Sequence, residues 1–136
     1  MTETSKEVVK RFNKEVIEQG NAASFQELMS ATFINHSAPA GMNNGPEGMR
    51  YFFEEVLRSA MTGLQVTIHA QVAEGDLVTT RKTISGIQTG PFLSIAPTHK
   101  QIAIDVIDVV RVQNGKYVEH WGLTTLPSVL AELTQQ

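Results

Sequence analysis

The chain has 136 residues, about the size of one typical domain, and we expect residues 1–136 to form a single domain. Its composition, 41% apolar and 18% charged, is typical of globular proteins and argues against disorder. The net charge of −3 excludes a nucleic-acid binder that acts through bulk basicity. Without cysteine there is no disulfide framework, thiolate nucleophile or Cys-type zinc site. No apolar run reaches membrane-spanning length and the N-terminus lacks an apolar signal core, so we expect a cytoplasmic protein without membrane partners.

The first half of the sequence has helical periodicity. Thr4 and Glu7 have the spacing of a capping box, and the helix that they begin is expected to end at Gly20. A short second helix follows, with Ser24 as its candidate N-cap. After a loop rich in proline and glycine, a third helix with a wide apolar stripe is expected over residues 46–61.

The second half changes to the period of a β-strand. Apolar and polar residues alternate over 64–72, which predicts a strand with one buried face, and residues 77–87 return beside it. The longest apolar strand covers 101–112, and a hairpin at Asn114-Gly115 leads to a last strand over 116–124. Helices followed by a meander of long strands predict an α+β fold, a curved antiparallel sheet packed against three N-terminal helices, shaped as a cone with a mouth.

One carboxylate interrupts the apolar face of the longest strand. The even positions of 101–112 hold Asp108 and otherwise only apolar residues, which are Ile102, Ile104, Val106, Val110 and Val112. An ionised carboxylate costs several kcal/mol to bury unless it is paired, so Asp108 is a candidate site residue. Lost hydration would raise its pKa, and a nearby cation would lower it. The alternative is a structural acid that a neighbour caps or that a bulge turns outward.

His120 lies on the partner strand, and the length of the hairpin loop decides which face it shares. A two-residue loop at Asn114-Gly115 places Asp108 and His120 on opposite faces, whereas an odd-length loop places them on the same face. The Asn-Gly dipeptide favours the even loop, and the core-facing Asp108 favours the odd one. On one face, the two side chains are suited to proton transfer. The alternative for His120 is a structural histidine bonded to a backbone carbonyl.

Arg81 lies in the middle of the strand over 77–87. It could pair with Asp108 or Asp105, or bind a carboxylate or enolate, and the alternative is a solvated surface residue. The four histidines have neither His-x-x-x-His nor His-x-His spacing, so no metal site is expected.

Short segments in order along the chain resemble the SnoaL-like polyketide cyclase (ester cyclase) family. They are Phe33–Ser37, Gly45–Gly48, Val72–Asp76 with Arg81, Ala96–Thr98, Ile107–Arg111 with Gly115-Lys116, and Glu119–Trp121. The resemblance implies the cone-shaped α+β barrel of the nuclear-transport-factor-2-like superfamily, with a deep apolar pocket. It also places the Glu119–Trp121 strand in that pocket.

The resemblance implies a reaction as well. The best-known members close polycyclic rings by intramolecular aldol condensation, without metal or cofactor, using an Asp as acid and base with a His nearby. Aligned on Gly115-Lys116, the family's His position falls on Asp108 and its Asp position on Gly122, which carries no proton. The sequence therefore departs from the family's catalytic pair.

Two functions from different classes follow. The first is a cofactor-free cyclase or isomerase-type enzyme acting on a small apolar carbonyl or polyketide-like substrate, with Asp108 as general acid or base and His120 as the second proton-transfer group. The second is a non-catalytic binder of a lipophilic metabolite, which Gly122 favours. In both, the expected pocket-lining residues are Asn35, Phe52, Arg81 and Trp121.

A variant of the enzyme hypothesis uses Asp105, Arg81 and Asp108 as epoxide hydrolases of this fold do. Strand parity counts against it, because Asp105 and Asp108 point to opposite faces unless a bulge intervenes.

A homodimer is also expected. The outer face of the sheet would be unusually apolar for a monomer, because Ile107, Val109, Tyr117 and Leu123 are expected there. Members of the family commonly dimerise through that face.

Overall fold

The computed structural model describes residues 3–135. Its helical segments are α1 (Ser5–Arg11), which continues as the π-helical η1 (Phe12–Glu18), then α2 (Ala22–Leu28), the continuous run α3 (Pro46–Tyr51), η2 (Phe52–Leu57) and α4 (Arg58–Ala60), and α5 (Leu126–Leu133). Its strands are β1 (Met29–Asn35), β2 (Met61–Glu74), β3 (Leu77–Gln88), β4 (Gln101–Gln113) and β5 (Lys116–Thr124).

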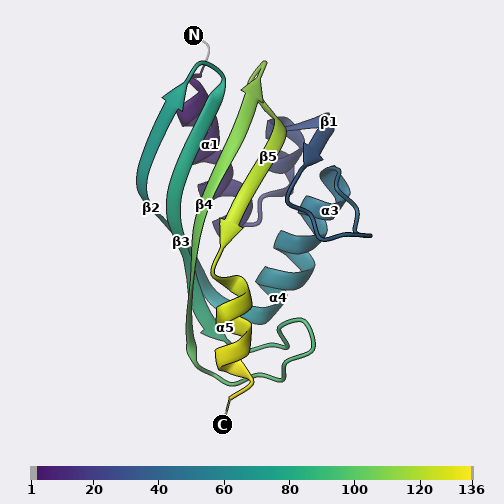
Figure 1. Cartoon of the computed structure of the whole chain (residues 1–136), viewed down its shortest axis with the longest axis vertical. Helices are drawn as coiled ribbons and strands as arrows, with labels where there is room; N and C mark the ends of the chain where they lie inside the picture. The colour runs from purple at the N-terminus through teal and green to yellow at the C-terminus, as the bar shows by residue number, and fades with distance from the viewer. Residues whose placement is uncertain (1–2, 136) are drawn as a thin grey trace.

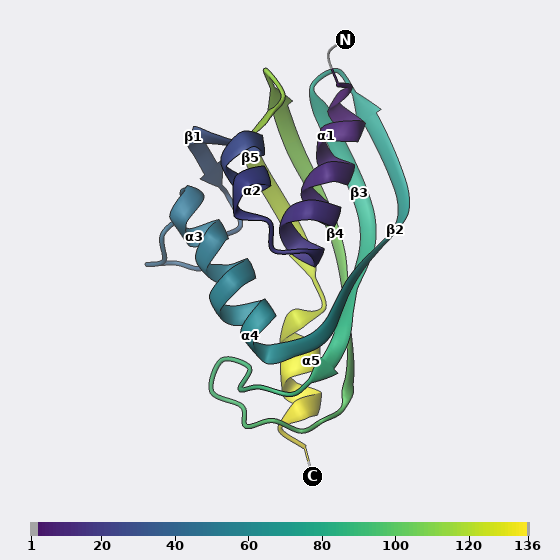
Figure 2. The same cartoon turned by 180° about the vertical axis from the view of Figure 1, so that it is seen from behind.

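The five strands form one curved sheet in the order β1-β5-β4-β3-β2, as Figure 1 shows. Neighbours from β2 to β5 are antiparallel, and β1 joins β5 in parallel. The helices from α1 to α4 cover one face of the sheet, which is the near face in Figure 2. This confirms the expected α+β class with three N-terminal helical segments. The curved sheet is open, because β1 and β2 remain as its edges.

The helix boundaries follow local capping chemistry. The capping box at Thr4 forms as predicted, since its hydroxyl accepts the Glu7 N–H and its N–H donates to the Glu7 carboxylate. Pro46 opens α3. The predicted cap at Ser24 is wrong by one turn, because Asn21 is the N-cap and its side chain accepts the Ser24 N–H at 3.1 Å.

The hairpin between β4 and β5 resolves the question of shared faces by combining a two-residue turn with a bulge. Asn114 and Gly115 have φ values of 53° and 73°, as the tight turn requires. One extra residue, Val118, then enters β5, because Val112 pairs with Tyr117 but Arg111 pairs with Glu119. The bulge reverses the alternation of all later β5 residues, so His120 faces the same side as Asp108.

A second bulge corrects the predicted burial of β2. Ile68 pairs with Lys82 but Ala70 pairs with Arg81, so His69 is the extra residue. The alternation over 64–72 therefore fails at its end, and Val72, expected to be buried, is 67% exposed.

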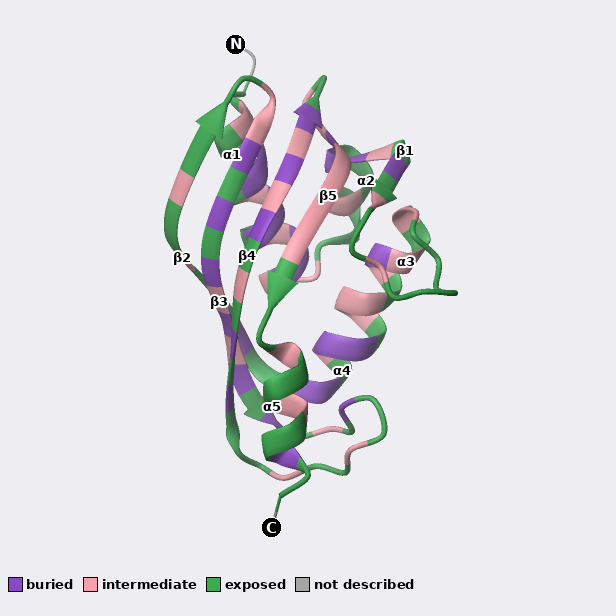
Figure 3. Ribbon diagram, in the orientation of Figure 1, coloured by how far each residue is buried: buried purple, intermediate pink, exposed green. Residues whose placement is uncertain are grey.

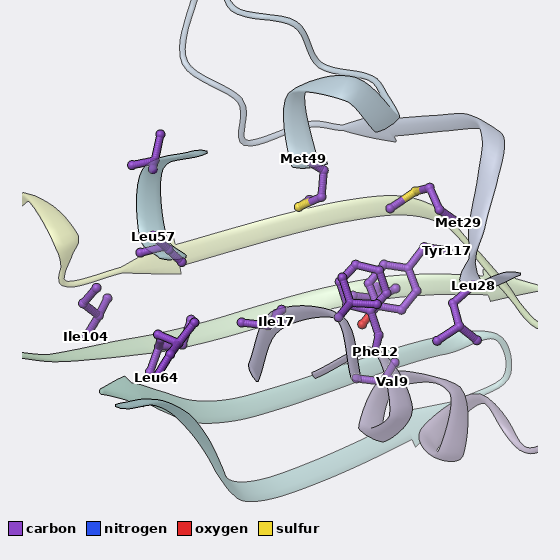
Figure 4. Packing of buried hydrophobic residues seen from close by; sticks show 14 of the residues in the cluster. Val9, Phe12, Ile17, Leu28, Met29, Met49, Leu57, Leu64, Ile104 and Tyr117 are labelled. Atoms are coloured by element: carbon purple, nitrogen blue, oxygen red, sulfur yellow. The ribbon is translucent and has the colours of Figure 1, made fainter. Parts of the chain in front are cut away.

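The core lies between the helices and the sheet. Phe12 stacks on Tyr117 at a centroid distance of 4.1 Å (Figure 4). Phe25 and Phe53 also pack against Phe12. The expectation that Tyr117 lies on the outer face is wrong, because Tyr117 pairs with the buried Val112, between the turn and the bulge at Val118. Figure 3 shows the resulting alternation of buried and outward-facing residues along β3 and β4.

Candidate functional site

A cavity of about 730 Å³ opens between the α3–α4 run and the helix-covered face of the sheet. This volume falls in the range of small-molecule sites. Its lining is mostly apolar and includes Met42, Met49, Phe52, Phe53, Val56, Leu57, Ile84, Leu93, Ile104, Val106 and Leu126. Four polar side chains, one from each of four strands, also line it and contact one another: Asn35, Lys82, Asp108 and His120. The cavity therefore combines an apolar wall with one polar cluster.

Asp108 is the centre of this cluster. Its Oδ2 lies 3.3 Å from the Lys82 ammonium nitrogen and 3.3 Å from His120 Nε2. Its other oxygen, Oδ1, is buried without a hydrogen-bond partner among the described residues. Burial raises the pKa of this carboxyl, but the charge of Lys82 and the contact with His120 outweigh it, so the pKa lies below its ordinary value. Asp108 is therefore ionised at neutral pH.

Lys82 is held by the π-helical segment on the opposite side of the core. Where α1 widens into η1, the Asn13 side chain donates to the Val9 carbonyl at 2.8 Å. Its Oδ1 then accepts from the Lys82 ammonium at 2.6 Å. The irregular helical segment thus directs the Asn13 amide toward the buried Lys82 ammonium, which also faces Asp108.

His120 is fixed by the turn that follows β1. Asn35 Oδ1 accepts the Ser37 backbone N–H at 3.0 Å, which orients the amide, and the same oxygen lies 2.8 Å from His120 Nδ1. Because that oxygen only accepts, Nδ1 carries a hydrogen, and Nε2 is the ring atom that faces Asp108 and donates to it when the ring is protonated. The side chain of His120 is 16% exposed, against 7% for Asp108 and 4% for Lys82, so the imidazole is the most accessible of the three.

The family model for SnoaL-like polyketide cyclases matches residues 7–133. The chain belongs to this family. No curated protein matches the sequence.

Solved structures agree with the SnoaL-like assignment at the level of the fold. TsrD from Streptomyces laurentii is 23% identical over 98% of both chains, with a TM-score of 0.83. A protein of Jannaschia sp. CCS1 assigned as a SnoaL-like polyketide cyclase is 23% identical over 100% of this chain and 99% of its own, with a TM-score of 0.82. IdmH from Streptomyces antibioticus, assigned as a polyketide cyclase, is 22% identical over 98% of this chain and 100% of its own, also at 0.82. These structures share the α+β fold of this chain.

Within this SnoaL-like fold, the predicted site residues separate into two groups. Asn35 and Phe52 line the cavity together with Asp108 and His120. Arg81 does not, because odd residues of β3 point to the uncovered face of the sheet, where it borders a separate groove of about 390 Å³.

Trp121 is also absent from the cavity lining. It neighbours His120 along β5 and so points to the other face, where it stacks on His36 at a centroid distance of 4.8 Å. The three-residue alternative with Asp105 and Arg81 has no basis in the structure, because Asp105 is exposed on the uncovered face and accepts from Thr83 there.

The sequence prediction missed Lys82 and Asn13. Strand parity could have found Lys82, which shares its face with Val78 and Ile84. Asn13 gave no such signal, since a polar residue within a helix is usually a surface residue.

Residues 3–135 contain neither a cluster of metal-ligating side chains nor a helix suited to cross a membrane. No three His, Asp or Glu side chains there gather as a metal site would require. No helix in this range is long and apolar enough to cross a membrane.

Proposed function

We propose that this SnoaL-like protein is a cyclase or isomerase-type enzyme that performs acid–base chemistry on a small apolar carbonyl or polyketide-like substrate. The observation that carries the proposal is the contact of His120 with the ionised Asp108 inside an apolar cavity. A carboxylate and an imidazole at the wall of a mostly apolar cavity are suited to moving a proton on a bound substrate.

The geometry supports separate roles for the two groups. Nε2 is the ring atom that exchanges the proton, because Asn35 occupies Nδ1. The 3.3 Å contact of Nε2 with Asp108 is longer than a strong charge-assisted hydrogen bond, so a substrate atom can take its place. In the proposed step, a proton passes from the carbon beside the carbonyl to the pair and returns to the substrate at the new position. Asp108 balances the positive charge that forms on the ring, and Lys82 keeps the carboxylate ionised.

Deuterium exchange tests this proposal without knowledge of the natural substrate. The protein is incubated in D₂O with 2-tetralone or a cyclic 1,3-diketone, and NMR follows loss of the protons beside the carbonyl. We expect the wild type to accelerate the exchange and Asp108→Asn or His120→Gln to slow it about 10²–10⁴-fold. Arg81→Gln, on the uncovered face, is the matched control and keeps the wild-type rate. Equal rates in the wild type and both site variants would overturn the proposal.

The second function is a non-catalytic binder of a lipophilic metabolite. It is favoured by Gly122, which stands where the resemblance places the family's proton-carrying Asp. For a binder, the same ketones raise the unfolding midpoint without any acceleration of exchange. A ligand at a hundred times its dissociation constant stabilises the folded state by about 2.7 kcal/mol, so binding is measurable even without turnover.

A further inference from the structure

We propose that Gly122 is a positioning residue of this site: its missing side chain is the space in which the His120 imidazole lies against Asp108. The inference rests on the proposed function and adds a residue that itself holds no proton.

The space beside Gly122 is filled by the imidazole. A Cβ at position 122 would lie 2.9 Å from Cε1 and 3.2 Å from Nε2 of His120, and 3.5 Å from the Cβ of Asp108. Real Cβ atoms essentially never approach another heavy atom within 3.0 Å. Any side chain at 122 therefore competes with the ring for one position.

Backbone conformation does not explain the glycine. Gly122 is not among the glycines with positive φ, so an L-residue could adopt its dihedral angles. Gly122 is therefore required for the space that it leaves, and alanine tests that space directly.

The backbone around Gly122 cannot retreat to relieve the clash. Gly122 pairs with Asp108 across the sheet, and its N–H donates to the Ser37 hydroxyl at 2.7 Å. The His120 carbonyl accepts the His36 N–H at 2.8 Å, which holds the other end of the segment. Relief must therefore come from the imidazole, which would leave both Asp108 and Asn35.

A double-mutant cycle separates this role from a general need for glycine in β5. Gly122→Ala in the wild type is expected to lower the unfolding midpoint by about 3–6 °C, since overpacking strains a held ring. In a His120→Ala background, the same substitution is expected to change the midpoint by less than about 1 °C, because nothing remains to clash. Equal losses in the two backgrounds would overturn the proposal.

A spectroscopic measurement completes the test. In the wild type, the ¹⁵N shifts of the His120 ring are expected to show a hydrogen on Nδ1, as the contact with Asn35 requires. In Gly122→Ala, these shifts are expected to average between the two tautomers, as for a solvated ring. Unchanged shifts would contradict the positioning role. Neither readout needs turnover, so a protein that fails the deuterium-exchange test can still pass this one, and the reverse.

Discussion

Arg81 and Lys82 are neighbours on β3, but the sheet places them in opposite environments. Arg81 is exposed on the uncovered face and has no ion pair among the described residues. Lys82 is 4% exposed on the covered face, where Asp108 and Asn13 share its ammonium. The same formal charge is therefore solvated in one case and part of a buried network in the other. The difference shows that the site depends on the face that a residue occupies more than on its type.

The difference between Lys82 and Arg81 can be tested by removing each charge separately. Lys82→Met keeps most of the volume but leaves Asp108 without its cation, so we expect the free energy of unfolding to fall by about 3–5 kcal/mol. Arg81→Met is the matched control and is expected to change it by about 0.5 kcal/mol or less. Urea denaturation at pH 7 measures both.

A double variant guards against the case in which Lys82→Met does not fold. Lys82→Met with Asp108→Asn removes both charges, and we expect it to recover stability relative to Lys82→Met alone. Similar losses for Lys82→Met and Arg81→Met would mean that the buried pair is not what distinguishes the two faces.

Ionisation of Asp108 makes the stability of the fold depend on pH. Its pKa is lower in the folded chain than in the unfolded one, so the carboxylate stabilises the fold above its unfolded pKa. That stability is lost as the pH falls from about 5 through the folded pKa. Urea denaturation between pH 6 and pH 3 should therefore show a smaller loss in Asp108→Asn than in the wild type. Identical pH profiles would contradict the pKa shift.

A smaller effect is expected one contact further away, at Asn13. Asn13→Leu removes one of the hydrogen bonds to the Val9 carbonyl and leaves one Lys82 N–H unsatisfied in the core, which should cost about 1–3 kcal/mol of unfolding free energy. On the uncovered face, Thr83 makes a similar polar connection between His69 and Asp105, but in solvent. Thr83→Val is the control and should cost about 0.5 kcal/mol or less. The prediction fails if the two losses are equal.

Substitutions on the uncovered face are expected to have the smallest effect on the free energy of unfolding. They should instead change the oligomeric state. We propose that this face pairs two copies of the chain, since Ile107 and Leu123 lie opposite each other there and are 52% and 79% exposed. Light scattering at micromolar concentration should give about twice the chain mass of 14.9 kDa for the wild type. Ile107→Glu with Leu123→Glu should return the monomer mass. A wild-type monomer would refute the pairing.

The element order and the identity of the central carboxylate were predictable from the sequence. The alternation of β4 marked Asp108 as the single acid on an apolar face, and the structure buries it. The capping box at Thr4 and the turn at Asn114-Gly115 were also predictable, because each depends on interactions within a few residues.

Lys82 has the parity of the buried β3 residues, but the positions of His120 and Asn13 depended on features that the sequence pattern does not mark. Counting residues outward from the Asn114-Gly115 turn places His120 on the wrong face, and the bulge at Val118 puts it on the right one. Likewise, Asn13 reaches Lys82 only because α1 widens into η1.

Local sequence is enough to place the beginnings of the helices and strands, to identify the apolar face of β4, and to show that Asp108 interrupts it. These features depend on backbone propensity and on a period of two residues, which short stretches of chain contain in full. Packing between distant elements brings Lys82 and His120 to Asp108 and Asn35 to His120, and it keeps Arg81 and Trp121 out of this cluster. Each strand residue changes face when one extra residue enters the ladder, and whether a bulge forms is set by packing against distant elements rather than by its own neighbours.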